Sequence, residues 1–178
     1  MQVLEQIQQA AADRGLRFIV IGGFAVIEHG YARMTADLDL LIRRVDRQEW
    51  RTLLADLSYG LVHDGDTFLQ FSRTDQADWP VDLMLVHQET FDGLYRETKP
   101  CQVHGVRIQL VSLSHLLALK LHVLKQARLH RFLKDFQDVI ELIRLNKIDL
   151  RSDAIRDLFL RYGNEDLYEK IKRACLNP

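Results

Sequence analysis

The chain has 178 residues, of which 47% are hydrophobic and 28% charged, and this composition predicts a globular protein with a full hydrophobic core. Lysines and arginines number 24 against 25 aspartates and glutamates, so the formal net charge is -1. A chain so balanced has no overall field to draw it onto nucleic acid or an anionic membrane, and only a local basic patch could serve such binding.

Two cysteines, Cys101 and Cys175, lie far apart in the sequence and outside any CxxC motif, so zinc and redox chemistry have no support. The N-terminal segment is amphipathic and lacks the apolar core of a signal peptide. No apolar run approaches the roughly 18 residues of a membrane span. We therefore expect a soluble cytoplasmic protein.

The first part of the chain alternates between helical and strand patterns. Gly15 ends the first helical pattern, Asp46 is a plausible helix cap, and Asp64-Gly65 indicates a hairpin. The predicted elements are a helix over 2–14, a strand over 17–21, a short helical stretch over 22–30, a strand over 37–42, a helix over 46–58, strands over 60–63, 67–73 and 80–86, a helix over 89–96, and strands over 101–104 and 106–111.

From Ser112 onward the sequence is almost entirely helical, with Asn146 and Gly163 as stop signals. The predicted helices cover 113–128, 131–145, 151–162 and 164–175. The chain therefore reads as α+β, with an α+β core over 1–111 and a C-terminal helical region over 112–178. The order of elements is not a regular βαβ repeat, which argues against a doubly wound sheet. No flexible linker separates the two parts, so we expect the helical region to pack on the core.

Two aspartates with glycines upstream form the first candidate site. Asp37 and Asp39 are two apart on a predicted strand, so their side chains share one face, while Leu38 and Leu40 point to the other. Like charges there repel, and a divalent cation with its preference for carboxylate oxygens removes that penalty. Gly22-Gly23 follows a strand and opens a helix, where backbone N–H groups can hold a phosphate, although a plain tight turn would look the same.

The order of residues in this segment resembles the signature of AbiEii-type toxins and related minimal nucleotidyltransferases of the DNA polymerase beta superfamily. The matching positions are Gly22, Gly23, Ala25, His29, Gly30, Arg33, Thr35, Asp37 and Asp39. The resemblance implies a nucleotidyltransferase fold, meaning a small mixed sheet with flanking helices, followed here by a C-terminal helical bundle. It also implies that the glycines hold a nucleoside triphosphate and that both aspartates bind metal, and it makes Thr35 a further candidate for nucleotide binding. Arg33 could contact phosphate as a fork donor or be an ordinary loop arginine.

The superfamily also implies a third carboxylate on a neighbouring strand, and Asp82 is the best candidate. It is the lone charge in the apolar run 80–86, where an aspartate is costly unless it is paired or bound to metal. Its implied role is to bind the catalytic metal and act as base on the acceptor. Asp75 and Asp78 lie in a polar loop and are weaker candidates. The order of residues around Asp82 is also similar to that of aminoglycoside and lincosamide nucleotidyltransferases.

Lys120 falls near the middle of the apolar stripe of its predicted helix, where a lysine is excluded unless it snorkels or reaches an anion. Together with the R-x-x-K-D-x-x-D segment over 131–138, it resembles the C-terminal motifs of AbiEii-type enzymes. This implies that Lys120 contacts the nucleotide and that Asp135 supports the active site. Asp138, further round the helix, stays open as the alternative to Asp135. Lys120, Lys125, Arg128 and Arg131 could together form a local basic patch.

These observations predict a Mg²⁺- or Mn²⁺-dependent enzyme that transfers a nucleotide from an NTP to an acceptor hydroxyl. The acceptor stays open between tRNA, a protein and a small molecule such as an aminoglycoside or lincosamide. A toxin role with a cognate antitoxin as partner is compatible with the resemblance. The alternatives are a nucleotide-binding module without turnover and a plain interaction domain.

Overall fold

A computed structural model describes residues 2–73, 79–103, 105–126 and 129–176. The chain divides into two compact units. Unit 1 comprises residues 1–25 and 34–112, and unit 2 comprises residues 26–33 and 113–178. Unit 2 thus takes in residues 26–33, which the sequence pattern places with the core. Contacts within unit 2 explain this, because the Asn146 side chain donates a hydrogen bond to the backbone oxygen of His29 and the Arg33 guanidinium pairs with Asp138.

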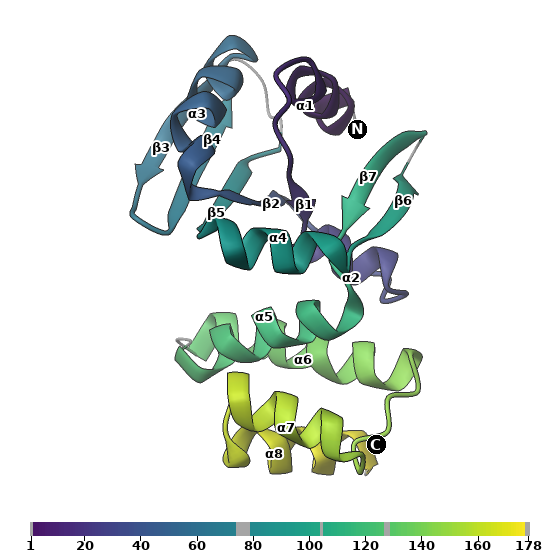
Figure 1. Cartoon of the computed structure of the whole chain (residues 1–178). Coiled ribbons are helices and arrows are strands. Elements are labelled where there is room, and N and C mark those ends of the chain that lie inside the picture. The colour runs from purple at the N-terminus through teal and green to yellow at the C-terminus, as the bar shows by residue number, and fades with distance from the viewer. Residues whose placement is uncertain (1, 74–78, 104, 127–128, 177–178) are drawn as a thin grey trace. The chain divides into compact units, whose positions relative to one another are not determined.

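Unit 1 is built on a seven-stranded mixed sheet in the order β3-β4-β5-β2-β1-β7-β6 (Figure 1). The β2–β5 and β1–β7 pairs are parallel, and the other four pairs are antiparallel. The strands are β1 (Ile19–Val20), β2 (Leu38–Arg43), β3 (Tyr59–Asp64), β4 (Phe68–Arg73), β5 (Val81–Val86), β6 (Lys99–Val103) and β7 (Val106–Leu110). The mixed sheet agrees with the predicted α+β class. His104, predicted to end a strand, lies outside the described residues.

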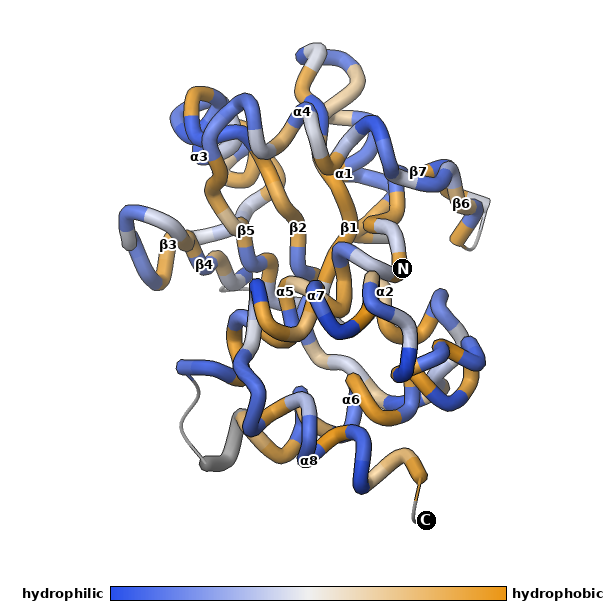
Figure 2. The backbone as a smooth tube through the Cα atoms, turned by 60° about the horizontal axis from the view of Figure 1, so that its bottom comes forward, coloured by the Kyte–Doolittle hydropathy of each residue, from blue (hydrophilic) through white to orange (hydrophobic). Residues whose placement is uncertain are grey.

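The central strands form the core of this unit. Leu40, Leu41 and Ile42 of β2 and Leu83 of β5 have no exposed surface, which is typical of parallel strands covered on both faces. Figure 2 shows the β5, β2 and β1 segments as largely hydrophobic. The continuous apolar runs in the sequence therefore report burial from both sides.

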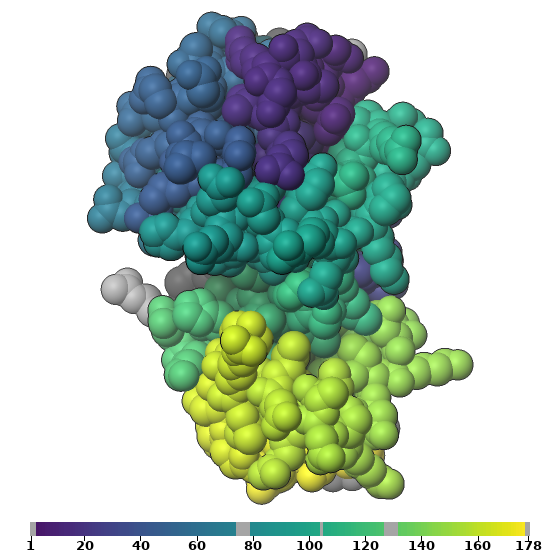
Figure 3. Space-filling model, viewed as in Figure 1, coloured from purple at the N-terminus to yellow at the C-terminus, as the bar shows by residue number. Residues whose placement is uncertain are grey.

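The helices of unit 1 are α1 (Gln2–Asp13), α3 (Arg47–Asp56) and α4 (Gln88–Arg96), and a 3-10 turn, η1 (Arg44–Asp46), precedes α3. Figure 3 shows α1 (purple) lying directly against α3 (blue). Trp50 of α3 is fully buried and its ring meets the Phe18 ring edge-on at 5.7 Å. The predicted role of Asp46 as a helix cap is wrong, because its carboxylate accepts two hydrogen bonds from the Arg43 guanidinium and caps no backbone N–H.

Unit 2 is helical. Its helices are α5 (Leu113–Gln126), α6 (Leu129–Leu145), α7 (Asp153–Tyr162) and α8 (Glu165–Leu176), and α2 (Gly22–Glu28) begins in unit 1 and ends in unit 2. Figure 1 shows α5 beside α6 and α7 beside α8. The core includes Val139, Phe159 and Ile171, all fully buried. No helix among the described residues is long and apolar enough to cross a membrane.

Asn164 provides a test of how α8 begins. Its side-chain oxygen accepts the backbone N–H of Leu167 at 2.9 Å, which satisfies one of the N–H groups that the first turn of a helix leaves without a partner. We expect Asn164→Ala to destabilise the protein by about 1 kcal/mol, and Asn164→Asp, which keeps the acceptor, to melt close to wild type. Urea unfolding measures both variants. Equal stability of Asn164→Ala and wild type would contradict this role.

Candidate functional site

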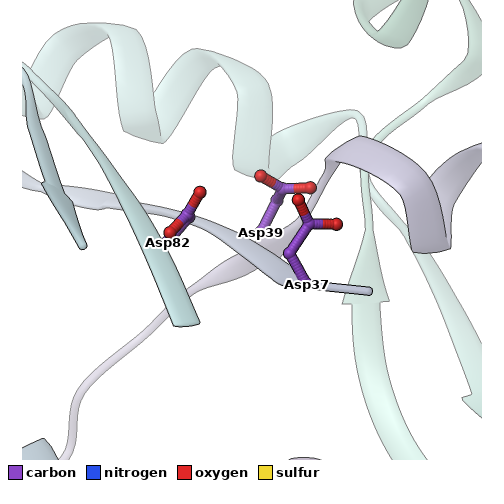
Figure 4. A group of neighbouring side chains, drawn as sticks. All are labelled: Asp37, Asp39 and Asp82. Atoms are coloured by element: carbon purple, nitrogen blue, oxygen red, sulfur yellow. The ribbon is translucent and has the colours of Figure 1, made fainter. Parts of the chain in front are cut away.

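Asp37, Asp39 and Asp82 come together in unit 1. One carboxylate oxygen from each residue lies within 4.8 Å of the others, as Figure 4 shows. Asp37 directly precedes β2, Asp39 lies on β2, and Asp82 lies on β5. Because β2 and β5 are parallel neighbours in a register that pairs Asp39 with Asp82, the two carboxylates are side by side. The structure therefore brings together the three aspartates that the sequence singled out.

Local hydrogen bonds orient two of these carboxylates. The Thr35 hydroxyl donates to Asp37 Oδ1 at 2.8 Å, and the backbone N–H of Gly23 donates to Asp39 Oδ2 at 3.3 Å. The main chain of Asp39 is held as well, since its oxygen accepts the N–H of Ile21 at 3.0 Å. Thr35 and Gly23, both predicted to contact nucleotide, thus also fix the direction of the acidic side chains.

Gly22 has two independent reasons to be glycine. Its φ of +61° lies in the left-handed region that side chains disfavour. A Cβ added there would stand 1.8 Å from Asp39 Oδ2, so the Asp39 side chain occupies the space that any other residue would need. The sequence suggested phosphate binding for Gly22 and Gly23, and that role stays a prediction. The structure adds that this pair makes room for Asp39 and hydrogen-bonds to it.

The donor set suits a hard divalent cation. All three groups are carboxylates, and they approach one another although like charges repel. Asp82 is 8% exposed, while Asp37 and Asp39 are half-buried. Oxygen ligands in this number, on a partly open site, match the preference of Mg²⁺ and Mn²⁺. The three aspartates present therefore fit such an ion. The weaker candidates Asp75 and Asp78 lie outside the described residues.

The other predicted site residues form a buried ionic cluster inside unit 2. Lys120 Nζ lies 2.6 Å from Asp135 Oδ1 and 2.6 Å from Asp138 Oδ2. Arg33 donates through Nε to Asp138 Oδ1 at 2.7 Å and through Nη2 to Asp138 Oδ2 at 2.9 Å. Asp138 therefore forms ion pairs with both Lys120 and Arg33. It is also the most buried member of the cluster, at 1% exposure.

This cluster shows where both aspartates of α6 lie, and the choice between Asp135 and Asp138 as the functional aspartate stays open. Asp138 lies not on the outer face of α6 but at the centre of the cluster, with Asp135 beside it. Residues three apart on a helix lie on the same side, so both aspartates reach Lys120. The signal was present in the sequence as two aspartates spaced i, i+3 next to an apolar stripe that continues through Val139 to Ile143. That Lys120 and Arg33 contact the nucleotide, and that Asp135 supports the nucleotide-binding site, stay predictions.

The basic patch suggested around α5 and α6 is not formed by the described residues. Lys120, its first member, is buried and ion-paired. Arg128 and the side chain of Arg131 lie outside the described part of the chain. Of the four suggested residues, only Lys125 both belongs to the described part of the chain and is exposed.

Comparisons with known proteins bear on the fold. No family model matches the chain, and a search of curated proteins finds no match. Among solved structures, the antibiotic-resistance factor ANT(2'')-Ia is similar with a TM-score of 0.65 at 12% identity, over 99% of this chain and 97% of that one. A nucleotidyltransferase-like protein from Paracoccidioides brasiliensis follows with a TM-score of 0.59 at 17% identity, over 99% of this chain and 96% of that one.

The lincosamide antibiotic adenylyltransferase LnuA is also similar, with a TM-score of 0.58 at 13% identity, over 80% of this chain and 97% of that one. The chain therefore has the nucleotidyltransferase fold, as the sequence predicted. Two of its three clustered aspartates lie on neighbouring parallel strands, and Asp37 directly precedes one of these strands.

Gly22 can be tested against a matched glycine. Gly15 has nearly the same φ, +65°, but an added Cβ there meets nothing within 4 Å. Gly15→Ala should therefore lose only the roughly 1–2 kcal/mol of a left-handed residue. Gly22→Ala should lose more and displace Asp39, which we expect to appear as a lower melting temperature and weaker Mn²⁺ binding. Equal behaviour of the two variants would show that Asp39 does not need the space above Gly22.

Asp138 can be tested against Asp135. Removing one partner of a buried ion pair leaves an uncompensated charge and typically costs about 3–5 kcal/mol. Asp138→Asn weakens the pairing of both Arg33 and Lys120, whereas Asp135→Asn leaves Lys120 with Asp138. We expect urea unfolding to give the larger loss for Asp138→Asn. A larger loss of stability for Asp135→Asn would show that Asp135, and not Asp138, is the central aspartate of the cluster.

Proposed function

We propose that this protein is a metal-dependent nucleotidyltransferase that moves an NMP from an NTP to an acceptor hydroxyl. One observation carries the proposal: three carboxylates, two on neighbouring parallel strands and one directly before a strand, have oxygens within 4.8 Å of one another in a chain with the nucleotidyltransferase fold. Asp37, Asp39 and Asp82 would hold Mg²⁺ or Mn²⁺. Gly22 and Gly23 would lie against the triphosphate, and Lys120 and Arg33 would add positive charge towards it.

In the proposed reaction the acceptor oxygen forms a bond to the α-phosphorus, and the bond from that phosphorus to the pyrophosphate breaks. When bound, the metal supplies charge neutralisation for the triphosphate and makes the acceptor hydroxyl more acidic. The Asp82 carboxylate accepts the proton of the acceptor hydroxyl. Thr35 and Gly23 hold Asp37 and Asp39 in fixed directions, so no reorganisation of these side chains is needed as the reaction proceeds.

Two kinds of acceptor are supported by different observations. A structure of ANT(2'')-Ia contains adenylyl-2''-tobramycin and one of LnuA contains lincomycin, which favours a small-molecule alcohol. The AbiEii-like order of residues over 22–39 favours a tRNA or a protein as acceptor, and with it a toxin that has a cognate antitoxin. The first acceptors to test are therefore an aminoglycoside, a lincosamide and bulk tRNA.

A second candidate function is a nucleotide-binding module without turnover. It is favoured over the enzyme by the pairing of Lys120 and Arg33 with aspartates, because cations already neutralised within the protein contribute less to stabilising the charge that develops during transfer. This module would show a nucleotide-dependent rise in melting temperature and no release of pyrophosphate. The intact acidic triad favours the enzyme.

The test combines thermal shift with labelled-NTP transfer. Each NTP is titrated with and without Mg²⁺, and transfer of label is then measured with the nucleotide that shifts the melt. Asp39→Asn keeps the shape of the side chain but removes a metal ligand, so we expect the metal-dependent shift to vanish and transfer to fall by more than about a hundredfold.

Asp66→Asn is the matched control, since it makes the same chemical change at an exposed aspartate of unit 1. It should behave as wild type. Transfer by Asp39→Asn at the rate of this control would rule out the assignment of the triad.

A further inference from the structure

A cavity of about 390 Å³ lies within unit 2, where the end of α6, the loop before α7 and the end of α8 meet. Four cationic side chains line it: Arg144, Lys147, Arg151 and Lys172. Asp149 is the one acidic residue among the lining residues. We call this cavity the basic pocket, and its volume lies in the range of small-ligand sites.

Two of the four cations are anchored by the protein. Arg144 donates through Nη2 to the backbone oxygen of Ala174 at 2.5 Å and lies 3.5 Å from Glu141. Lys172 lies 3.6 Å from Glu169 and 5.2 Å from the centre of the Tyr168 ring. These contacts fix the two side chains at the wall of the pocket.

The other two cations are exposed, and no carboxylate of the described residues lies within 4.0 Å of Lys147 or Arg151. The nearby Asp149 accepts the backbone N–H of Arg151 at 2.9 Å. The basic pocket therefore gathers more positive charge than its own acid neutralises. An anion from outside the chain would relieve the repulsion between these cations.

The net charge of the chain is close to zero because the two units carry net charges of opposite sign. Unit 2 carries 14 lysines and arginines against 10 aspartates and glutamates, whereas unit 1 carries 10 against 15. The unit that holds the basic pocket is therefore the cationic one, and a cationic surface of this kind is the electrostatic footprint of a phosphate-rich partner.

The inner wall of the pocket is apolar. Ile143 and Leu150 are 3% and 6% exposed and line it together with Ile148. Two guanidinium groups and two ammonium groups above an apolar wall suit a ligand that combines a phosphate with a flat ring. We propose that the basic pocket is a binding site for a nucleotide, either free or as part of a single-stranded RNA. The site is separate from the acidic triad, and its occupancy does not depend on nucleotidyl transfer.

Cys175 gives a direct readout in the wild-type protein, because it lines the basic pocket. Burial raises the pKa of the Cys175 thiol, so alkylation is best followed at mildly alkaline pH. Cys101 belongs to unit 1 and is the internal control. The probes are AMP and a single-stranded RNA decamer, each without divalent metal.

We expect a probe that binds the pocket to slow alkylation of Cys175 several-fold and to leave Cys101 unchanged. Protection by AMP identifies a free nucleotide as sufficient, and protection by RNA alone identifies a strand. Absence of protection with both probes overturns the proposal. Neither result bears on the acidic triad, so failure here is distinct from failure of the proposed transferase activity.

A pair of double variants tests the cations themselves. Lys147→Gln/Arg151→Gln removes the two cations of the basic pocket that pair with no carboxylate of the described residues, and Lys170→Gln/Arg173→Gln removes two exposed cations of α8 that do not line it. Both variants change the net charge equally. We expect the dissociation constant of the protecting probe to rise about tenfold or more for the pocket variant and less than twofold for the control.

If the probe is RNA, the slope of the logarithm of the binding constant against the logarithm of salt concentration should also decrease by about 1.4 for the pocket variant, since each lost phosphate contact on a single strand contributes about 0.7. Equal weakening by both double variants would mean that only overall charge matters, and this would overturn the proposal.

Discussion

The parallel pairing of β2 with β5 is the constraint on which the acidic site depends. In register, it aligns Asp39 with Asp82 and brings two carboxylates together at the centre of a sheet whose neighbouring residues are fully buried. Hydrophobic burial of residues such as Leu40 and Leu83 holds the strands in this register against the repulsion of the charges. The acidic site is thus stabilised by the core beneath it. A slip of β2 by one residue would turn Asp39 to the other face of the sheet, away from Asp82, and would bury the wrong set of β2 side chains.

The two units use charge in opposite ways. In unit 1, the three aspartates are close together and suited to a cation from outside. In unit 2, Lys120, Arg33, Asp135 and Asp138 neutralise one another inside the protein. Such a cluster gives limited net stability because desolvation offsets much of the attraction, but loss of either aspartate leaves a buried cation without its full complement of partners. Its geometry makes Asp138 a structural centre whether or not nucleotide approaches.

The sequence identities to similar structures are low, between 12% and 17%, and yet nearly the whole chain is covered in two of the three. The likeness is therefore one of fold, with little identity of sequence.

Local patterns in the sequence predicted the strands, several turns and the acidic site of this protein. Apolar runs predicted each strand to within a few residues, the shortest being Ile19–Val20 within the predicted 17–21, and Gly15 and Asp64-Gly65 marked their turns. The Asp-x-Asp spacing and the single charge at Asp82 indicated the acidic site, because aspartate is unfavourable in a buried strand without a partner.

Only the tertiary structure decided how distant residues meet. The steric need for Gly22 depends on Asp39, which lies 17 residues away in sequence and approaches only once β2 is placed. The fork of Arg33 on Asp138 joins residues 105 apart, and the basic pocket assembles from three segments of unit 2. Sequence periodicity determines which face of a helix or strand is buried. The residues that this face contacts depend on how distant elements pack together, and a local sequence pattern carries no information about that packing.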